Sequence, residues 1–155
     1  YKFKFDLVGT TLNQSDNNHL KYVKKNLITK ISRKYINFQK PINYKTTNNL
    51  MTKYDILVNF GTSKAVDKVV LEAMASGLLI FTNNPIYKSV FDKEMRQLYY
   101  CDSNKNIILA KKLQNLFFLS YLQKKKLSKR GIQLINKKHN LNNLVEYIYK
   151  EAKSK

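Results

Sequence analysis

The sequence contains very few of the residues that build disulfide-rich, zinc-binding or membrane-spanning proteins. Its 155 residues include one cysteine, Cys101, and two histidines, His19 and His139. One cysteine forms no internal disulfide, and with two histidines it is too few for a zinc site. No apolar run approaches the roughly 20 residues of a membrane-spanning helix, and no signal peptide opens the chain. These absences predict a cytoplasmic protein in a reducing compartment.

Acidic residues are scarce as well. The chain has 29 Lys and Arg against 10 Asp and Glu, a formal net charge of +19. Such an excess is common in nucleic-acid-binding proteins, but the arginines favoured for contacts with bases and phosphates number only three, Arg33, Arg96 and Arg130. Asn, Ile and Tyr are abundant too, as A/T-rich codons produce in any protein. We therefore expect mostly solvated lysines and no nucleic-acid partner.

Hydrophobic residues make up 43% of the chain, enough for a core, and their spacing alternates between strand and helix. Apolar runs predict strands over residues 3–8, 35–38, 55–60, 78–82 and 98–101. Helical spacing predicts a helix from residue 16, one near 50–51 capped by Thr46 or Thr47, one over 66–76 closed by Gly77, one over 86–91, and a helical remainder. This order predicts an α/β fold with a doubly wound parallel sheet, forming one domain over residues 1–155.

Parallel sheets of this kind bind ligands beyond the carboxyl ends of their strands. The loops over residues 9–11, 41–44, 61–63 and 82–84 follow the predicted strands, so we expect them to converge at one edge. The helix over 66–76 carries a carboxylate, Glu72, among apolar residues. The simplest interpretation is an ion pair with Lys68 one turn earlier. A lysine in the first turn opposes the helix dipole, however, and an anionic ligand at the helix start would remove that conflict.

The segment Leu71-Glu72-Ala73-Met74-Ala75-Ser76-Gly77, followed by an apolar strand, resembles the hallmark of family 4 glycosyltransferases, in the carboxyl-terminal donor-binding half of their GT-B fold. Residues 5–9 and 54–58 are similar to two strands of that half, and the tail from Asn104 is similar to its closing helices. The resemblance implies retaining transfer from a UDP-, GDP- or ADP-sugar to a glycan or lipid-linked acceptor, as in polysaccharide biosynthesis, with no cofactor. No Asp-x-Asp pair occurs, so we expect no metal.

By this resemblance, Glu72 corresponds to the second Glu of the E-x7-E motif, which accepts hydrogen bonds from the ribose hydroxyls of the donor. The first Glu falls at 72 − 8 = 64, where this chain has Lys64. Lys64 implies a different or acidic donor sugar, a phosphate contact, or loss of activity. The pair Asp67-Lys68 resembles a less common branch in which either residue takes over that role. The implied site has Lys64 and Asp67 as catalytic residues and, around the donor, Glu72, Lys68, Val66, Ala65, Thr10 and Asn43.

The first residue is Tyr, and the diphosphate-binding and acceptor groups of the resembled family lie upstream of this half. We therefore expect that the amino-terminal acceptor domain is missing and that this chain alone is inactive, with the enzyme peripheral at the inner face of the membrane. Two alternatives stay open. One is a non-catalytic, basic Rossmann-like module that binds RNA or anionic lipid, and the other is a degraded homologue that keeps the fold without activity.

Overall fold

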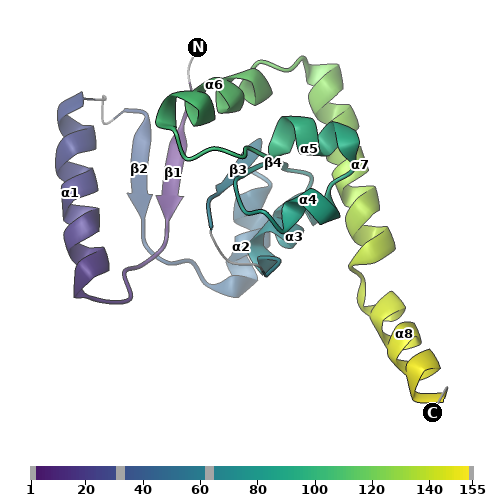
Figure 1. Ribbon diagram of the computed structural model, residues 1–155. Helices are drawn as coiled ribbons and strands as arrows, with labels where there is room; N and C mark the ends of the chain where they lie inside the picture. The colour runs from purple at the N-terminus through teal and green to yellow at the C-terminus, as the bar shows by residue number, and fades with distance from the viewer. Residues whose placement is uncertain (1–2, 31–33, 62–64, 154–155) are drawn as a thin grey trace. The chain divides into compact units, whose positions relative to one another are not determined.

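The computed structural model describes residues 3–30, 34–61 and 65–153. The chain divides into two compact units, Tyr1–Thr47 and Asn48–Lys155. Both units contain parallel strands connected through helices, so the α/β class is confirmed (Figure 1).

The first unit is built on two parallel strands connected by a helix. The strands are β1 (Phe5–Val8) and β2 (Ile36–Gln39), and the connecting helix is α1 (Gln14–Lys30). The predicted strands over 3–8 and 35–38 are thus confirmed in position. The Gln39 amide donates a 2.7 Å hydrogen bond to Asp6 Oδ2 and links the two strands through their side chains.

Helix α2 (Tyr44–Met51) begins earlier than the sequence pattern indicates. Thr46 and Thr47 are not its caps, because their hydroxyls donate to the backbone carbonyl of Asn43 at 2.8 and 3.2 Å. Asn43 instead starts the helix: its side-chain oxygen accepts from the Lys45 N–H at 3.1 Å. Asparagine accepts from backbone N–H groups in this way at turns and helix starts. The sequence pattern therefore places the start of α2 too late.

The second unit opens with the βαβ segment predicted from the sequence. Its parts are β3 (Ile56–Asn59), α3 (Lys68–Ala75) and β4 (Leu79–Thr82), and the two strands pair in parallel. All four residues of β4 are buried, whereas those of β3 are half-buried. The apolar run over 78–82 is therefore a core strand, as expected for a parallel strand covered on both faces.

Gly77 ends helix α3 in a left-handed conformation, with φ +86°. Its N–H donates to the Met74 carbonyl at 3.0 Å, and the Leu78 N–H donates to the Ala73 carbonyl at 2.9 Å. This pair of bonds is the Schellman motif, which satisfies the last carbonyls of a helix. The predicted closing glycine is confirmed, and it turns the chain directly from α3 into β4.

The predicted strand over 98–101 is wrong. Most of this stretch belongs to helix α5 (Lys93–Tyr99), and only a single parallel bridge joins Tyr100 to Thr82. Asp92 explains the difference, because its carboxylate caps α5 by accepting from the Met95 N–H at 3.0 Å. A capped helix start favours helix over the residues that follow. The predicted helix over 86–91 is present as α4 (Tyr87–Val90).

The helical remainder is confirmed as α6 (Asn106–Phe117), α7 (Tyr121–Lys138) and α8 (Leu141–Lys153). Several apolar residues of these helices are nevertheless largely exposed, among them Ile107 at 81%, Leu122 at 76% and Val145 at 56%. Helical spacing places residues on a common face but does not show which part of that face another element covers. No helix within the described ranges is long and apolar enough to cross a membrane.

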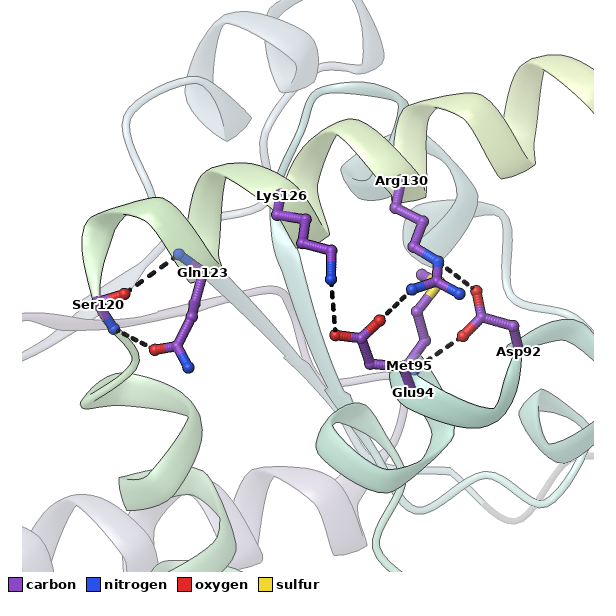
Figure 2. Close-up of polar contacts among 7 residues, drawn as sticks. All are labelled: Asp92, Glu94, Met95, Ser120, Gln123, Lys126 and Arg130. Atoms are coloured by element: carbon purple, nitrogen blue, oxygen red, sulfur yellow. Dashed lines mark hydrogen bonds and ion pairs between the residues drawn. The ribbon is translucent and has the colours of Figure 1, made fainter.

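Polar contacts fix α7 to α5 and define where α7 begins (Figure 2). Ser120 and Gln123 form a reciprocal capping box at the start of α7. Further along, the Arg130 guanidinium contacts Asp92, with Nε 2.7 Å from Oδ2, and it also contacts Glu94. Helix α7 also packs against α3, the helix that carries Glu72. The contacts between α7 and α5 therefore support α3 indirectly.

Candidate functional site

Polar side chains meet beyond the carboxyl ends of β3 and β4. The Gly61 N–H donates to Asn83 Oδ1 at 3.1 Å, and the Asn83 amide lies 3.4 Å from Asn104 Oδ1. At the strand ends, the Thr82 hydroxyl lies 3.5 Å from Asn59 Oδ1. The expected meeting of the loops after β3 and β4 is thus confirmed at Gly61 and Asn83.

One predicted catalytic residue, Lys64, lies outside the described residues, as do Thr62 and Ser63 of the same loop. The assignment of Lys64 to the donor sugar therefore stays a prediction.

Asn84 is the centre of the hydrogen-bond network at this edge. Its side chain is fully buried, and its amide nitrogen reaches Asp67 Oδ2 at 3.4 Å and the Ala65 carbonyl at 3.3 Å. Its side-chain oxygen accepts from the Ile86 N–H at 3.2 Å, and its own N–H donates to the Thr82 hydroxyl at 3.1 Å. Asn84 therefore connects the loop before α3 to the end of β4.

Tyr87 holds the backbone of the same loop. The Asp67 N–H donates to Tyr87 Oη at 2.9 Å, and Oη donates in turn to the Asp67 carbonyl at 3.3 Å. Burial raises the pKa of Tyr87 to about 12, and the negative charge of Asp67 adds to this rise, while the backbone hydrogen bond opposes it. The phenol is therefore protonated at neutral pH and can donate.

Asp67 occupies the N-cap position of α3 without capping it. Its backbone is extended, with φ −74° and ψ 125°, but its side chain makes no hydrogen bond to the first-turn N–H groups. The carboxylate contacts Asn84 instead. First-turn N–H groups favour anions, and in α3 the Val70 N–H donates to the Asp67 carbonyl at 3.0 Å. Among the backbone groups expected at the diphosphate, the N–H of Asp67 is engaged by Tyr87.

The remaining predicted residues before and in α3 take two different positions. Val66 is half-buried and packs against the core, so only its backbone is suited to a ligand contact. The Lys68 side chain is 72% exposed, and its Nζ lies 3.4 Å from Glu72 Oε1. The ion pair expected from the spacing is therefore present.

Glu72 is largely withdrawn from water, with its side chain 20% exposed. Its Oε1 is buried and has no hydrogen-bond partner among the described residues, although Lys68 lies nearby. An ion pair with a mostly exposed lysine contributes little to stability. A carboxylate that makes so few hydrogen bonds in the protein retains the capacity to accept from two hydroxyls of a ligand.

Thr10 and Asn43 belong to the first unit, where both are exposed. The Thr10 hydroxyl lies 3.5 Å from the carbonyl oxygen of the adjacent Thr11, and Asn43 starts α2. Their assignment to the phosphates and the base stays a prediction. No three His, Cys, Asp or Glu side chains in the described ranges are grouped to hold a metal ion.

The sequence analysis missed Asn84 and Tyr87. The sequence pattern predicts a loop over residues 82–84 and a helix over residues 86–91, which describes the backbone but not the side chains. The available signal was the position: two amide side chains directly follow a buried strand, at the edge where parallel sheets bind ligands.

No protein-family model matches the sequence, and no curated protein matches it either. A solved structure does match: the crystal structure of the catalytic domain of cholesterol-α-glucosyltransferase from Helicobacter pylori, with 14% sequence identity and a TM-score of 0.60. The match covers 88% of this chain and 99% of that chain. The chain therefore has the α/β, Rossmann-like fold of one half of a GT-B glycosyltransferase.

Proposed function

We propose that this chain is the carboxyl-terminal, donor-binding domain of a retaining family 4 glycosyltransferase. It binds a nucleoside diphosphate sugar and acts with an amino-terminal acceptor domain on a glycan or lipid-linked acceptor at the inner face of the membrane. The observation that carries this proposal is Glu72, a carboxylate largely withdrawn from water on a helix that starts beyond the end of β3. The fold and the Leu-Glu-Ala-Met-Ala-Ser-Gly segment support it.

In this proposal different residues in and next to α3 bind different parts of the donor. Glu72 accepts hydrogen bonds from the two ribose hydroxyls. These bonds are charge-assisted, and such bonds are stronger than hydrogen bonds between neutral groups. The first turn of α3 meets the diphosphate, since its N–H groups and the helix dipole favour an anion there. The Asp67 carboxylate accepts from hydroxyls of the donor sugar. No metal ion enters this arrangement, because the lysines and the helix start supply the positive charge.

Calorimetric titration of the chain with UDP, GDP and ADP tests the proposal. We expect one of the three to bind, because the base contacts select a nucleotide while Glu72 and α3 serve the ribose and diphosphate of any of them. A matched titration with uridine, guanosine and adenosine shows whether the diphosphate contributes. The proposal fails if no nucleotide binds.

The second candidate function, a basic module that binds RNA or anionic lipid, rests on the distribution of charge. No carboxylate occurs between Asp102 and Glu146, and ten cations do. They are Lys105, Lys111, Lys112, Lys124, Lys125, Lys126, Lys129, Arg130, Lys137 and Lys138. Binding through such charges weakens steeply with salt. A salt-sensitive interaction with RNA or with anionic vesicles, in the absence of any nucleotide binding, would favour this candidate.

Lys64 is proposed to determine the choice of donor sugar. We expect Lys64→Glu to change which sugar conjugate of the preferred nucleoside diphosphate binds best, because a carboxylate accepts from sugar hydroxyls and a lysine only donates. Competition titrations with neutral and acidic sugar conjugates measure this preference. Lys53→Glu, the same change on an exposed lysine elsewhere in the chain, is the control. An unchanged order of affinities in Lys64→Glu would remove Lys64 from sugar recognition.

A further inference from the structure

We infer that Asn84 and Tyr87 are positioning residues that hold Asp67 from two sides for recognition of the donor sugar. This inference rests on the proposed function. Neither residue needs to touch the donor. Asn84 orients the Asp67 carboxylate, and Tyr87 fixes its backbone. All three belong to the second unit, so the arrangement lies within one compact body.

The Asn84 contact accounts for where the Asp67 carboxylate points. An aspartate at an N-cap normally accepts from an N–H of the first helical turn, and the Asp67 side chain makes no such bond. It lies 3.4 Å from the Asn84 amide, and a Cβ placed on Gly61 would be 3.9 Å from both groups. The carboxylate is therefore directed toward the end of β3 and not toward the first turn of α3.

The Tyr87 hydroxyl restrains the backbone of Asp67. A phenol that accepts from the Asp67 N–H and donates to the Asp67 carbonyl restrains the peptide groups on both sides of one residue. Tyr87 is fully buried and stacks on Phe91, with their ring centroids 5.3 Å apart. The restraint therefore comes from the core and not from a mobile surface side chain.

A carboxylate held in this way adds specificity because it is oriented before the ligand arrives. If Asp67 were released, its carboxylate would be free to turn toward the start of α3, where the diphosphate is proposed to bind. The two positioning residues thus separate the sugar contact from the diphosphate contact.

Tyr99 provides a matched control for Tyr87. It is also a buried tyrosine, 1% exposed, but its hydroxyl has no hydrogen-bond partner among the described residues. Burial raises the pKa of Tyr99, so this phenol is protonated as well. Tyr87→Phe and Tyr99→Phe therefore remove the same atom from the same kind of environment, and only the first removes a contact with Asp67.

The experiment measures two dissociation constants for each variant: one for UDP, GDP or ADP, whichever binds the wild type, and one for the glucose, mannose or glucuronate conjugate that binds best. Their ratio is the contribution of the sugar. We expect Tyr87→Phe and Asn84→Ala each to reduce this ratio about fivefold, the usual effect of one hydrogen bond. Tyr99→Phe leaves it unchanged. Urea unfolding of every variant confirms that it is folded during the titration.

Three outcomes would overturn the inference: a ratio in Tyr87→Phe equal to that in Tyr99→Phe, an unchanged ratio in Asn84→Ala, or a wild type that gains no affinity from any sugar. In all three the wild type still binds the nucleoside diphosphate, so the proposed function stands. Failure of the wild type to bind any nucleotide is the separate result that removes the proposed function. If Asn84→Ala does not fold, Tyr87→Phe against Tyr99→Phe decides alone.

Discussion

Replacing Gly77 with alanine is expected to lower the free energy of unfolding by about 2–3 kcal/mol. Holding an L-residue in the left-handed conformation costs about 1–2 kcal/mol, and Gly77 has φ +86°. The new Cβ would also lie 2.9 Å from Ser128 Oγ on α7, closer than a real Cβ contact, and displacing that hydroxyl costs up to about 1 kcal/mol more. Urea unfolding followed by circular dichroism measures the change.

Gly131→Ala is the matched control for Gly77→Ala. Gly131 is a buried glycine inside α7, and an added Cβ would lie 3.7 Å from Met74 Cε, an ordinary van der Waals distance. Alanine is favoured over glycine inside a helix by up to about 1 kcal/mol, so we expect unchanged or increased stability. A second control, Gly77→Ala combined with Ser128→Ala, removes the displaced hydroxyl and leaves the conformational cost. Equal stabilities of Gly77→Ala and Gly131→Ala would contradict the prediction.

Replacing Glu72 with glutamine is expected to weaken binding of the preferred nucleoside diphosphate about tenfold or more. Hydrogen bonds to a charged group contribute about 1.5–3 kcal/mol, and a neutral amide offers one acceptor oxygen where the carboxylate offers two. Stability should stay unchanged or rise, because the lost ion pair involves a lysine that is 72% exposed and the buried Oε1 has no hydrogen-bond partner among the described residues. Loss of affinity without loss of stability distinguishes a ligand-binding residue from a structural one.

Glu94→Gln on α5 is the matched control for Glu72→Gln. Glu94 pairs with Lys126 and Arg130 on α7 (Figure 2). Its replacement by glutamine removes the same negative charge as Glu72→Gln, but from a structural contact. These side chains are partly exposed, and the expected loss of stability is below about 1 kcal/mol. We expect nucleotide affinity to be unchanged. If Glu72→Gln and Glu94→Gln bind nucleotide equally well, Glu72 has no part in the site.

The sequence predicts those parts of the fold that depend on residues close together in the chain. A continuous apolar run makes β4 a buried strand, and the spacing of Val70, Ala73 and Met74 places one face of α3 in the core. Gly77 ends α3 because only glycine adopts its conformation without cost. The pairing of Lys68 with Glu72 follows from helical spacing alone.

The parts that the sequence does not predict depend on tertiary contacts. Residues 98–101 are apolar enough for a strand, but the Asp92 cap extends α5 as far as Tyr99. Exposed Ile107 and Leu122 share helical spacing with buried residues, and only packing distinguishes them. Asn84 is a turn residue by type, and its partners Ala65 and Asp67 lie on the far side of α3 in the sequence. No local pattern encodes such a contact.

Helix α7 carries seven cations and no carboxylate, and this composition makes it depend on its neighbours for its helical state. No acidic residue occurs between Tyr121 and Lys138, so α7 contains no internal pair of opposite charges and its lysines repel one another. We expect a detached α7 to be less helical than the docked helix, because packing on α3 and the ion pairs with α5 stabilise it. Because α7 packs against α3, we expect the two helices to open together. A ligand bound at α3 consequently stabilises α7 as well.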